Sequence, residues 1–442
     1  MKENKSVCAR MMLACVVAAV WQLGDRSAAW AQMTPVPPPP PVTAAPPPPV
    51  TAAPPPAAPA PVAPAPVAPA PAAAAPASNA MTTPSMAGPL VANPNPLNFP
   101  AGPLGPVYFN GAISGMGLFQ SSPETYLGDH GADFDISNGL VSLQNTSGWF
   151  QFFVQAGIYS FPALGTAYLH ADRTTGDFFG PVPVAYGKLV PNDTFSVEVG
   201  KLPTLIGAEY GFTFQNMNIE RGLLWGQEPI VSRGIQGNYT YGPVAFSLSL
   251  NDGFYSGDYD WLSGSATWTI DKLNTLELVA GGNFSRSSVA RFTSTPPFAA
   301  ITPPAQDNST ILNLIYTYSN APWTITPYFQ YTHVPSSASL GLADSDTYGA
   351  AILASYQIND NWSLAGRAEI IGSSGGTNLL GYGPGSGAFS FTLTPGWQRG
   401  IFFARADASV VSAWGTTPGD VFGSSGTTKT QGRLVLEGGI IF

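Results

Sequence analysis

The sequence predicts an all-β fold, a transmembrane antiparallel β-barrel of about 16 strands. Three observations lead to this prediction. From residue 107 onward, apolar and polar residues alternate in segments of about ten residues, the length of a tilted membrane-crossing strand. Short and long connections alternate between these segments, as in barrels with short periplasmic turns and long external loops. Only 10% of the 442 residues are charged, whereas soluble proteins carry about 25%.

The first 31 residues are predicted to be a signal peptide. Basic residues precede an apolar stretch over residues 11–23, and Ala29-Trp30-Ala31 fits a cleavage site before Gln32. A lipoprotein signal ending at Cys15 is the alternative, disfavoured because much of the apolar stretch follows that residue. Cys8 and Cys15 are the only cysteines, so the mature chain is expected to hold no disulfide and no catalytic thiol.

Residues 32–105 are predicted to form an extended, disordered periplasmic spacer. Between Thr34 and Ala80, 20 of 47 residues are Pro and most of the others are Ala, Val or Thr. Such a composition cannot pack a core and favours polyproline II, at about 3 Å per residue. A semi-rigid spacer is the favoured interpretation. Binding of peptidoglycan or of a Pro-recognising partner is the alternative.

The barrel is predicted to cover residues 106–442. Alternation is clearest in the later strands, where Val244, Phe246 and Leu248 oppose Ala245 and Ser247. The second and fourth strands alternate least clearly, so 14 strands remain an alternative. The candidate strands are 107–119, 134–144, 148–160, 182–190, 194–202, 231–241, 243–251, 260–270, 274–286, 309–319, 323–333, 346–358, 361–372, 387–396, 400–413 and 429–442.

The connections provide independent support for a barrel. Those after odd-numbered strands are mostly long, such as 203–230, 287–308, 373–386 and 414–428. A soluble β-sandwich or propeller is the alternative, but it needs a buried apolar face and no such regular alternation. The short turns follow the even-numbered strands at residues 145–147, 191–193, 242, 271–273, 320–322, 359–360 and near Pro395-Gly396.

The last strand has two chemically different faces and ends on an aromatic residue. Charged Arg433 and Glu437 lie on one face, and the other face carries Leu434, Leu436, Ile440 and Phe442. In a barrel the apolar face contacts lipid and the polar face a wet lumen. A terminal Phe resembles the end of bacterial outer-membrane barrels, whose last strand carries the assembly signal. The resemblance implies that Phe442 serves folding by the barrel assembly machinery.

Eight ionisable residues fall on predicted lumen faces. An Arg facing the lipid midplane costs about 2–4 kcal/mol, so these groups are expected to face a water-filled lumen. Arg367 with Glu369, and Arg405 with Asp407, are i,i+2 neighbours on one face. A solvated wall without a selective role is the alternative. The full set is Glu198, Glu277, Arg367, Glu369, Arg405, Asp407, Arg433 and Glu437.

Short Gly-rich motifs surround the connection 203–230. They are Gly200-Lys201-Leu202-Pro203-Thr204, followed by Gly207-Ala208-Glu209-Tyr210, Asn218-Ile219-Glu220-Arg221-Gly222 and Ser232-Arg233-Gly234-Ile235-Gln236-Gly237. With these motifs, residues from about 107 to 442 resemble the OmpL-like β-barrel porins of Gram-negative bacteria. The resemblance implies a passive channel in the outer membrane, without assigning a solute. The Pro/Ala-rich spacer lies outside the resemblance.

The connection 203–230, hereafter loop 3, is the candidate constriction. A freely solvated loop rarely exposes as many large apolar side chains as this one holds. By similarity to general porins, whose third loop folds inward, loop 3 is expected to narrow the barrel. Packing at a subunit interface or outside the barrel is the alternative. The charged constriction candidates are Glu209, Glu220, Arg221 and Glu228.

Other functional classes find little support in the sequence. Without the first 31 residues, 13 Lys and Arg stand against 24 Asp and Glu, a net charge of −11, so no basic patch suits nucleic acid. Only His130, His170 and His333 could serve a Ser–His pair, and no G-x-S-x-G motif appears. We therefore expect no enzyme and no cofactor.

Metal binding is also not expected. Three acidic groups could bind Ca²⁺ through carboxylate oxygens, but solvated acidic loops are the favoured interpretation. These groups are Asp129/His130/Asp133/Asp135, Asp258/Asp260 and Asp344/Asp346.

The sequence therefore predicts an outer-membrane porin for passive diffusion of small hydrophilic solutes or ions. A mild cation preference is expected, because five acids oppose three bases on the lumen faces and three acids oppose one base in loop 3. The expected partners are outer-membrane lipid and these solutes, and a monomer and a homotrimer both remain open. The rival interpretation is a surface structural or adhesive protein whose barrel is only an anchor.

Overall fold

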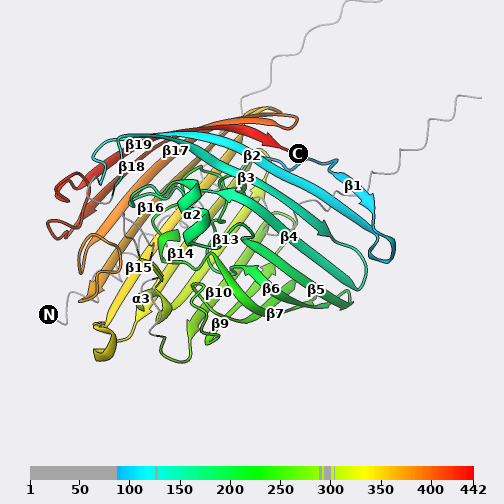
Figure 1. The fold of residues 1–442 in the computed structure, drawn as a ribbon, viewed down its shortest axis with the longest axis horizontal. Helices are drawn as coiled ribbons and strands as arrows, with labels where there is room; N and C mark the ends of the chain where they lie inside the picture. Colours follow the sequence, from blue (N-terminus) through cyan, green and yellow to red (C-terminus); the bar gives the residue numbers. More distant parts are fainter. Residues whose placement is uncertain (1–86, 125–127, 288–290, 293–299, 303) are drawn as a thin grey trace, which may run out of the picture. The chain divides into compact units, whose positions relative to one another are not determined.

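The computed structural model describes residues 87–442 apart from 125–127, 288–290, 293–299 and 303. The predicted signal peptide and the Pro/Ala-rich stretch lie outside the described residues. Sixteen strands form one closed antiparallel sheet (Figure 1). They are β2 (Pro106–Gln120), β3 (Ala132–Asn145), β4 (Phe150–Tyr159), β5 (Val184–Asn192), β6 (Phe195–Pro203), β7 (Val231–Tyr241), β8 (Val244–Asn251), β9 (Trp261–Thr269), β10 (Asn274–Asn283), β13 (Thr310–Asn320), β14 (Trp323–Val334), β15 (Ser345–Gln357), β16 (Trp362–Gly375), β17 (Gly387–Arg399), β18 (Phe402–Trp414) and β19 (Thr430–Ile441).

The barrel closes between its first and last strands. Figure 1 shows the red strand β19 beside the cyan strand β2, and the register runs from Arg433 opposite Gln120 to Ile441 opposite Ala112. Every barrel strand therefore has two neighbours, so the backbone groups are paired within the sheet. A lipid-exposed sheet requires this closure, because the bilayer core offers no hydrogen bonds to a free edge.

The two faces of the barrel are reversed relative to those of a soluble sheet. On β17, Phe389, Phe391 and Leu393 are exposed, whereas Ser390 and Thr392 between them are buried. The apolar face thus points outward and the polar face inward, which confirms the predicted fold class. Among the described residues, no helix is long and apolar enough to cross a membrane.

Sixteen strands, rather than the alternative of 14, agree with the structure, but one predicted turn is wrong. The sequence analysis places a turn near Pro395-Gly396, whereas β17 continues to Arg399. Proline lacks the N–H that a ladder needs. In the pairing of β17 with β18, Pro395 has no partner. Leu393 before it and Gly396 after it keep the same register with β18. The turn itself falls at Gly400, whose positive φ of 59° suits glycine.

The prediction of a disordered spacer up to residue 105 does not hold for its last part. Strand β1 (Leu97–Pro100) pairs with the first residues of β2 (Pro106–Phe109). Phe442 and Gly111 exchange backbone hydrogen bonds just beyond this segment. β19 ends there, so the start of β2 has an unpaired edge, and β1 occupies it. Residues 97–100 are held as a strand because this edge provides their hydrogen-bond partners.

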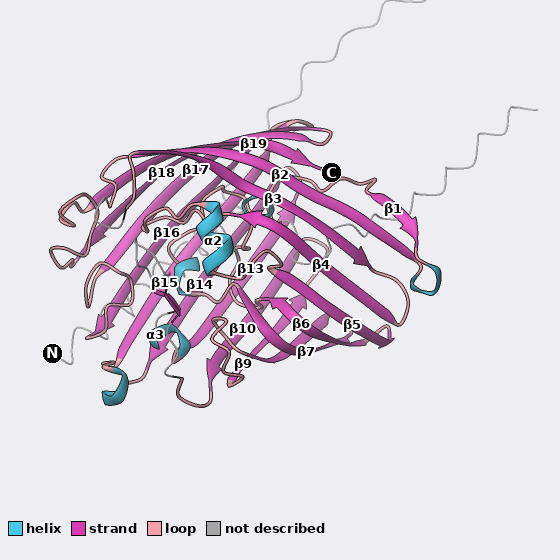
Figure 2. Ribbon diagram, in the orientation of Figure 1, coloured by secondary structure: helices cyan, strands magenta, loops and turns pink. Residues whose placement is uncertain are grey.

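Short elements complete the fold (Figure 2). None of them was predicted, because each is too short to give a periodic pattern. They are the helices α2 (Ala171–Asp177) and α3 (Pro304–Asp307), the 3-10 turns η2 (Gly102–Leu104), η4 (Thr213–Gln215), η5 (Trp225–Gln227) and η6 (Ala338–Leu340), and the hairpin of β11 (Arg291–Phe292) and β12 (Ala300–Thr302).

Candidate functional site

Loop 3 joins β6 to β7 and lies against the inward-facing side chains of the barrel. Gln330 of β14 donates a hydrogen bond of 2.9 Å to the Leu224 carbonyl. On the other side of the ring, Asn138 of β3 donates to the Thr213 hydroxyl. The loop therefore reaches strands that lie far apart around the barrel, and its charged candidates Glu209, Glu220, Arg221 and Glu228 are all buried.

Arg367 of β16 connects the barrel wall to loop 3. Its Nη1 lies 2.5 Å from Glu209 Oε1 and also donates to the Glu220 carbonyl at 2.7 Å. Its Nε lies 3.2 Å from Glu369 Oε2, at ion-pair distance but without hydrogen-bond alignment. Glu369 in turn accepts a hydrogen bond from the Leu223 backbone N–H at 3.0 Å. Two charged strand residues and two segments of loop 3 thus form one buried group. Buried charges are stable only with such ion-pair and hydrogen-bond partners.

Arg405 of β18 fixes a second part of the loop. Its Nη2 lies 2.5 Å from Glu437 Oε2 on β19, and the same guanidinium donates to the carbonyls of Thr213 and Asn216. The Thr213 hydroxyl donates to the other Glu437 oxygen at 2.6 Å. Each group therefore has partners from both the wall and the loop, which holds residues 213–216 against β18 and β19.

A third contact involves Glu220 at the loop's centre. Its carboxylate lies 3.0 Å from Arg433 Nη1 on β19. Its backbone N–H donates to Asp407 at 2.9 Å, and Asp407 also accepts from Thr394 at 2.6 Å. These contacts are direct hydrogen bonds to charged groups, which are stronger than neutral ones.

The structure places all eight predicted lumen residues at inward strand positions, and all except Glu277 are buried. The expectation of a water-filled lumen is wrong for six of them, because loop 3 covers this part of the wall. These six are Arg367, Glu369, Arg405, Asp407, Arg433 and Glu437. The predicted neighbours Arg367 and Glu369 form an ion pair. Arg405 pairs with Glu437 instead of Asp407, because Glu437 lies directly opposite on the next strand.

The other two lumen residues lie on the far side of the ring. Glu277 of β10 is half-buried, and Glu198 of β6 forms an ion pair of 3.0 Å with Lys188 of β5. The sequence analysis missed Lys188. Leu189 is exposed on the lipid side, so the neighbouring Lys188 points inward. This alternation was the signal that could have identified Lys188 as a lumen residue.

Two of the loop charges have no ion-pair partner within the described part of the chain. Both carboxylate oxygens of Glu228 are buried without a hydrogen bond. Burial, with the nearby charges of Glu209 and Glu369, raises the pKa of Glu228 well above its ordinary value. Arg221 donates to the Ile219 carbonyl at 3.0 Å and lies 5.4 Å from the Trp225 ring; burial lowers its pKa to about 10.

A narrow crevice runs beside loop 3. It is too small to hold a water molecule and lies between Pro229 and Thr204 of the loop and the inward residues Ser232, Gln236 and Asn251. These inward residues come from β7 and β8, on the side of the barrel away from the buried ion pairs. The loop thus meets uncharged polar side chains on this side and buried charges on the other.

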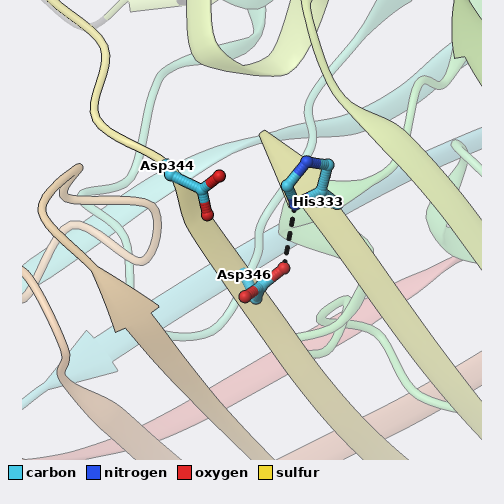
Figure 3. A group of neighbouring side chains, drawn as sticks. All are labelled: His333, Asp344 and Asp346. Atoms are coloured by element: carbon cyan, nitrogen blue, oxygen red, sulfur yellow. Dashed lines mark hydrogen bonds and ion pairs between the residues drawn. The ribbon is translucent and has the colours of Figure 1, made fainter. Parts of the chain in front are cut away.

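Three groups at the rim resemble a metal site in composition. Figure 3 shows His333 at the end of β14 beside Asp344 and Asp346, and their ligand-type atoms lie within 4.8 Å of one another. The dashed line marks the 2.9 Å contact of His333 Nδ1 with Asp346. Tyr331 donates to the same carboxylate at 2.8 Å. Internal hydrogen bonds therefore hold His333 and Asp346, whereas Asp344 is exposed.

The other acidic groups also have protein partners. His170 lies 3.2 Å from both Asp133 and Asp135. Asp258 accepts a hydrogen bond of 2.7 Å from the Ser287 hydroxyl. Asp129 and Asp133 are buried, and Asp133 and Asp135 lie on β3, so this group is not a solvated loop. The expectation that no metal binds stays a prediction.

Comparison with known proteins identifies a family and a fold. The family model described as "Putative beta-barrel porin-2, OmpL-like" matches residues 106–442. A search of curated proteins finds no match. Similar solved structures include a loop-deletion mutant of OmpT, an outer membrane protein of Vibrio cholerae, at 12% identity and a TM-score of 0.52, covering 76% of this chain and 99% of that chain.

Two further structures share the fold. The outer membrane channel DcaP of Acinetobacter baumannii is 10% identical with a TM-score of 0.51, covering 76% of this chain and 97% of that chain. An anion-selective porin from Comamonas acidovorans is 11% identical with a TM-score of 0.50, covering 76% and 99%. At such low identity these similarities concern the fold alone.

Proposed function

This chain belongs to the OmpL-like β-barrel porin-2 family, and from that membership we propose that it allows passive diffusion of small hydrophilic solutes or ions across the outer membrane. The family and the fold point to a channel rather than an enzyme. The observation that carries the proposal is the reversed barrel, because an apolar outer face and a polar inner face suit lipid outside and water inside. Such a channel selects by width and charge at its narrowest point.

We propose that loop 3 sets this narrowest point. Its contacts with β3, β14 and the strands β16 to β19 support the proposal, since they carry the loop across the interior. Packing at a subunit interface is less well supported, because the loop's charged groups bind inward-facing side chains. The proposed route of the solute runs along β7 and β8, whose inward residues Ser232, Gln236 and Asn251 are polar and uncharged.

The proposed selectivity is a mild cation preference. Most of the interior charges are paired and therefore contribute little, and the Debye length of about 10 Å at 0.1 M salt screens the remainder. The similarity to an anion-selective porin does not decide the sign, because side chains set it and the identity is low. Among the candidate residues of the lumen faces and loop 3, together with Lys188, eight acids stand against five bases. The acids are Glu198, Glu209, Glu220, Glu228, Glu277, Glu369, Asp407 and Glu437, and the bases are Lys188, Arg221, Arg367, Arg405 and Arg433.

Single-channel recording in planar bilayers tests this function. Under a KCl gradient, we expect ion conductance with a small reversal potential of the cation-selective sign, which decreases at high salt. Glu228→Gln should reduce the preference more at high pH than at low pH, because the raised pKa of Glu228 shifts its ionisation to higher pH. Asp360→Asn, at an exposed turn, is the matched control and should leave it unchanged.

The same recording separates the proposal from its rivals. A folded barrel that does not conduct would support the structural or adhesive anchor and reject the channel. An anion-selective wild type would reject the proposed constriction charge while leaving the channel intact. Hydrolysis of lipid by the purified protein would indicate an enzyme.

A further inference from the structure

The segment just before the barrel returns into the barrel interior. Strand β1 lies at the end of the barrel where β2 begins. Ten residues earlier, the backbone N–H of Ala87 donates 2.8 Å to the Gln215 carbonyl of loop 3. Read from β1 towards the N-terminus, the chain therefore passes from the periplasmic rim to the loop that we propose as the constriction.

The residues between these points contact the inner wall. Leu90 is only 3% exposed and belongs to the same buried apolar cluster as Ala112, Phe403 and Ile441, which face inward from β2, β18 and β19. Next to it, the Val91 N–H and carbonyl bind the side-chain amide of a single β17 residue, both at 2.8 Å. That residue is Gln398, near the periplasmic end of its strand.

The contact with loop 3 is too close for any residue but glycine. A Cβ added to Gly88 would lie 2.3 Å from the Asn216 carbonyl oxygen, well inside van der Waals contact. The Gly88 N–H also approaches the Gln215 carbonyl at 3.3 Å. Backbone hydrogen bonds, the buried Leu90 and the close approach of Gly88 thus fix residues 87–92 at one position against loop 3 and the inner wall.

The part of loop 3 that binds this segment is itself held firmly. Arg405 donates to the carbonyls of Thr213 and Asn216, and Glu437 binds both Arg405 and Thr213. The segment 87–92 therefore packs beneath a fixed portion of the loop rather than against a free surface. Its own charge is zero, so it occupies space without adding to the ionic selectivity.

We propose that residues 87–92 form an internal plug, which fills the periplasmic half of the lumen on the β17-to-β2 side and limits flow through the channel. The limit on flow rests on the proposed channel function. The placement of the plug does not, and the two are tested separately.

Cysteine cross-linking tests the placement. Val91→Cys combined with Gln398→Cys should cross-link efficiently in isolated outer membranes through a short bis-maleimide. Val91→Cys with Gln151→Cys, which replaces a glutamine on the distant strand β4, is the matched pair and should not. Single-cysteine variants give the background. Equal cross-linking of the two pairs, or none in the first pair, would overturn the placement.

Conductance tests the function of the plug. Deleting residues 32–96 should increase the single-channel conductance, whereas deleting residues 32–86, which keeps the plug, should leave it unchanged. Leu90→Gln should reproduce the increase and reduce cross-linking of the 91–398 pair. Val91→Gln, at a side chain that is 64% exposed, should leave the conductance unchanged.

The outcomes distinguish the two proposals. If the wild type and all deletions conduct equally, the plug is rejected and the channel stands. If no form conducts while the 91–398 pair still cross-links, the proposed function is rejected and with it the limit on flow, although residues 87–92 do lie in the barrel.

Discussion

At the scale of single residues, the unusual feature is the number of charges buried between loop 3 and the wall. A buried ion pair is costly to form, and removing one partner leaves an uncompensated charge. Most of the pairs here have additional hydrogen bonds from backbone or hydroxyl groups, which repay part of the cost of desolvation. The pairs therefore fix the position of the loop more than they add to stability.

Breaking the Arg405–Glu437 pair should destabilise the barrel. Arg405→Met leaves Glu437 buried and the carbonyls of Thr213 and Asn216 without their donor, so we expect a loss of about 3–5 kcal/mol in the free energy of unfolding. Urea titration of the refolded protein, followed by tryptophan fluorescence, measures it. The double variant Arg405→Met/Glu437→Leu should lose much less. Arg399→Met, at the exposed end of β17, is the control and should be near neutral.

Glu228 should make stability depend on pH. Its pKa in the folded protein is raised, so the protonated form is favoured on folding. The associated stability is fully present below the ordinary carboxyl pKa and is lost as pH rises through the raised value. Glu228→Gln removes this loss, so the variant should match wild type near pH 4 and unfold at a higher temperature near pH 8. An unchanged difference between wild type and variant across this pH range would contradict the buried, unpaired carboxylate.

At the scale of elements, the last strand joins the two ends of the barrel. Phe442 exchanges backbone hydrogen bonds with Gly111, and its ring lies 5.8 Å from that of Phe109 on the outer face. These contacts close the barrel at the point where β1 replaces β19 as the neighbour of β2. They are consistent with a role in assembly, which remains a prediction.

Deleting Phe442 should lower the amount of folded barrel in the membrane. The expected defect is in assembly, so the variant refolded into detergent should still show the heat-modifiable shift of a folded barrel on gels. Phe402→Ala removes another exposed aromatic residue from the neighbouring strand and is the matched control, with normal levels expected. Normal levels of the deletion variant in outer membranes would refute the assembly role.

At the scale of the whole molecule, one ring of strands encloses two different interiors. Loop 3 and the segment 87–92 fill the side formed by β16 to β19 and β2, where the ion pairs and Leu90 lie. The side of β7 and β8 carries uncharged polar residues such as Ser232, Gln236 and Asn251. A porin built in this way depends on what folds into the barrel as much as on the barrel itself.

The sequence alone determined the barrel. Strand positions followed from a period of two and from alternating turn lengths, both of which are local, and most strand boundaries agree with the structure within two or three residues. The error at Pro395 is also local in origin, since a Pro-Gly pair suggests a turn wherever it occurs. Inward and outward positions were predictable for the same reason, because neighbouring side chains point to opposite faces.

The tertiary structure decided what lies inside. Arg405 binds Glu437, and residues 87–92 return beneath loop 3, through contacts between residues that are far apart in the chain. Charge and alternation cannot show which distant group will cover an inward side chain. The sequence analysis therefore predicted water beside inward charges that loop 3 covers in the structure. The burial of a charge depends on long-range packing, whereas the face of a strand on which it lies is set by its immediate neighbours.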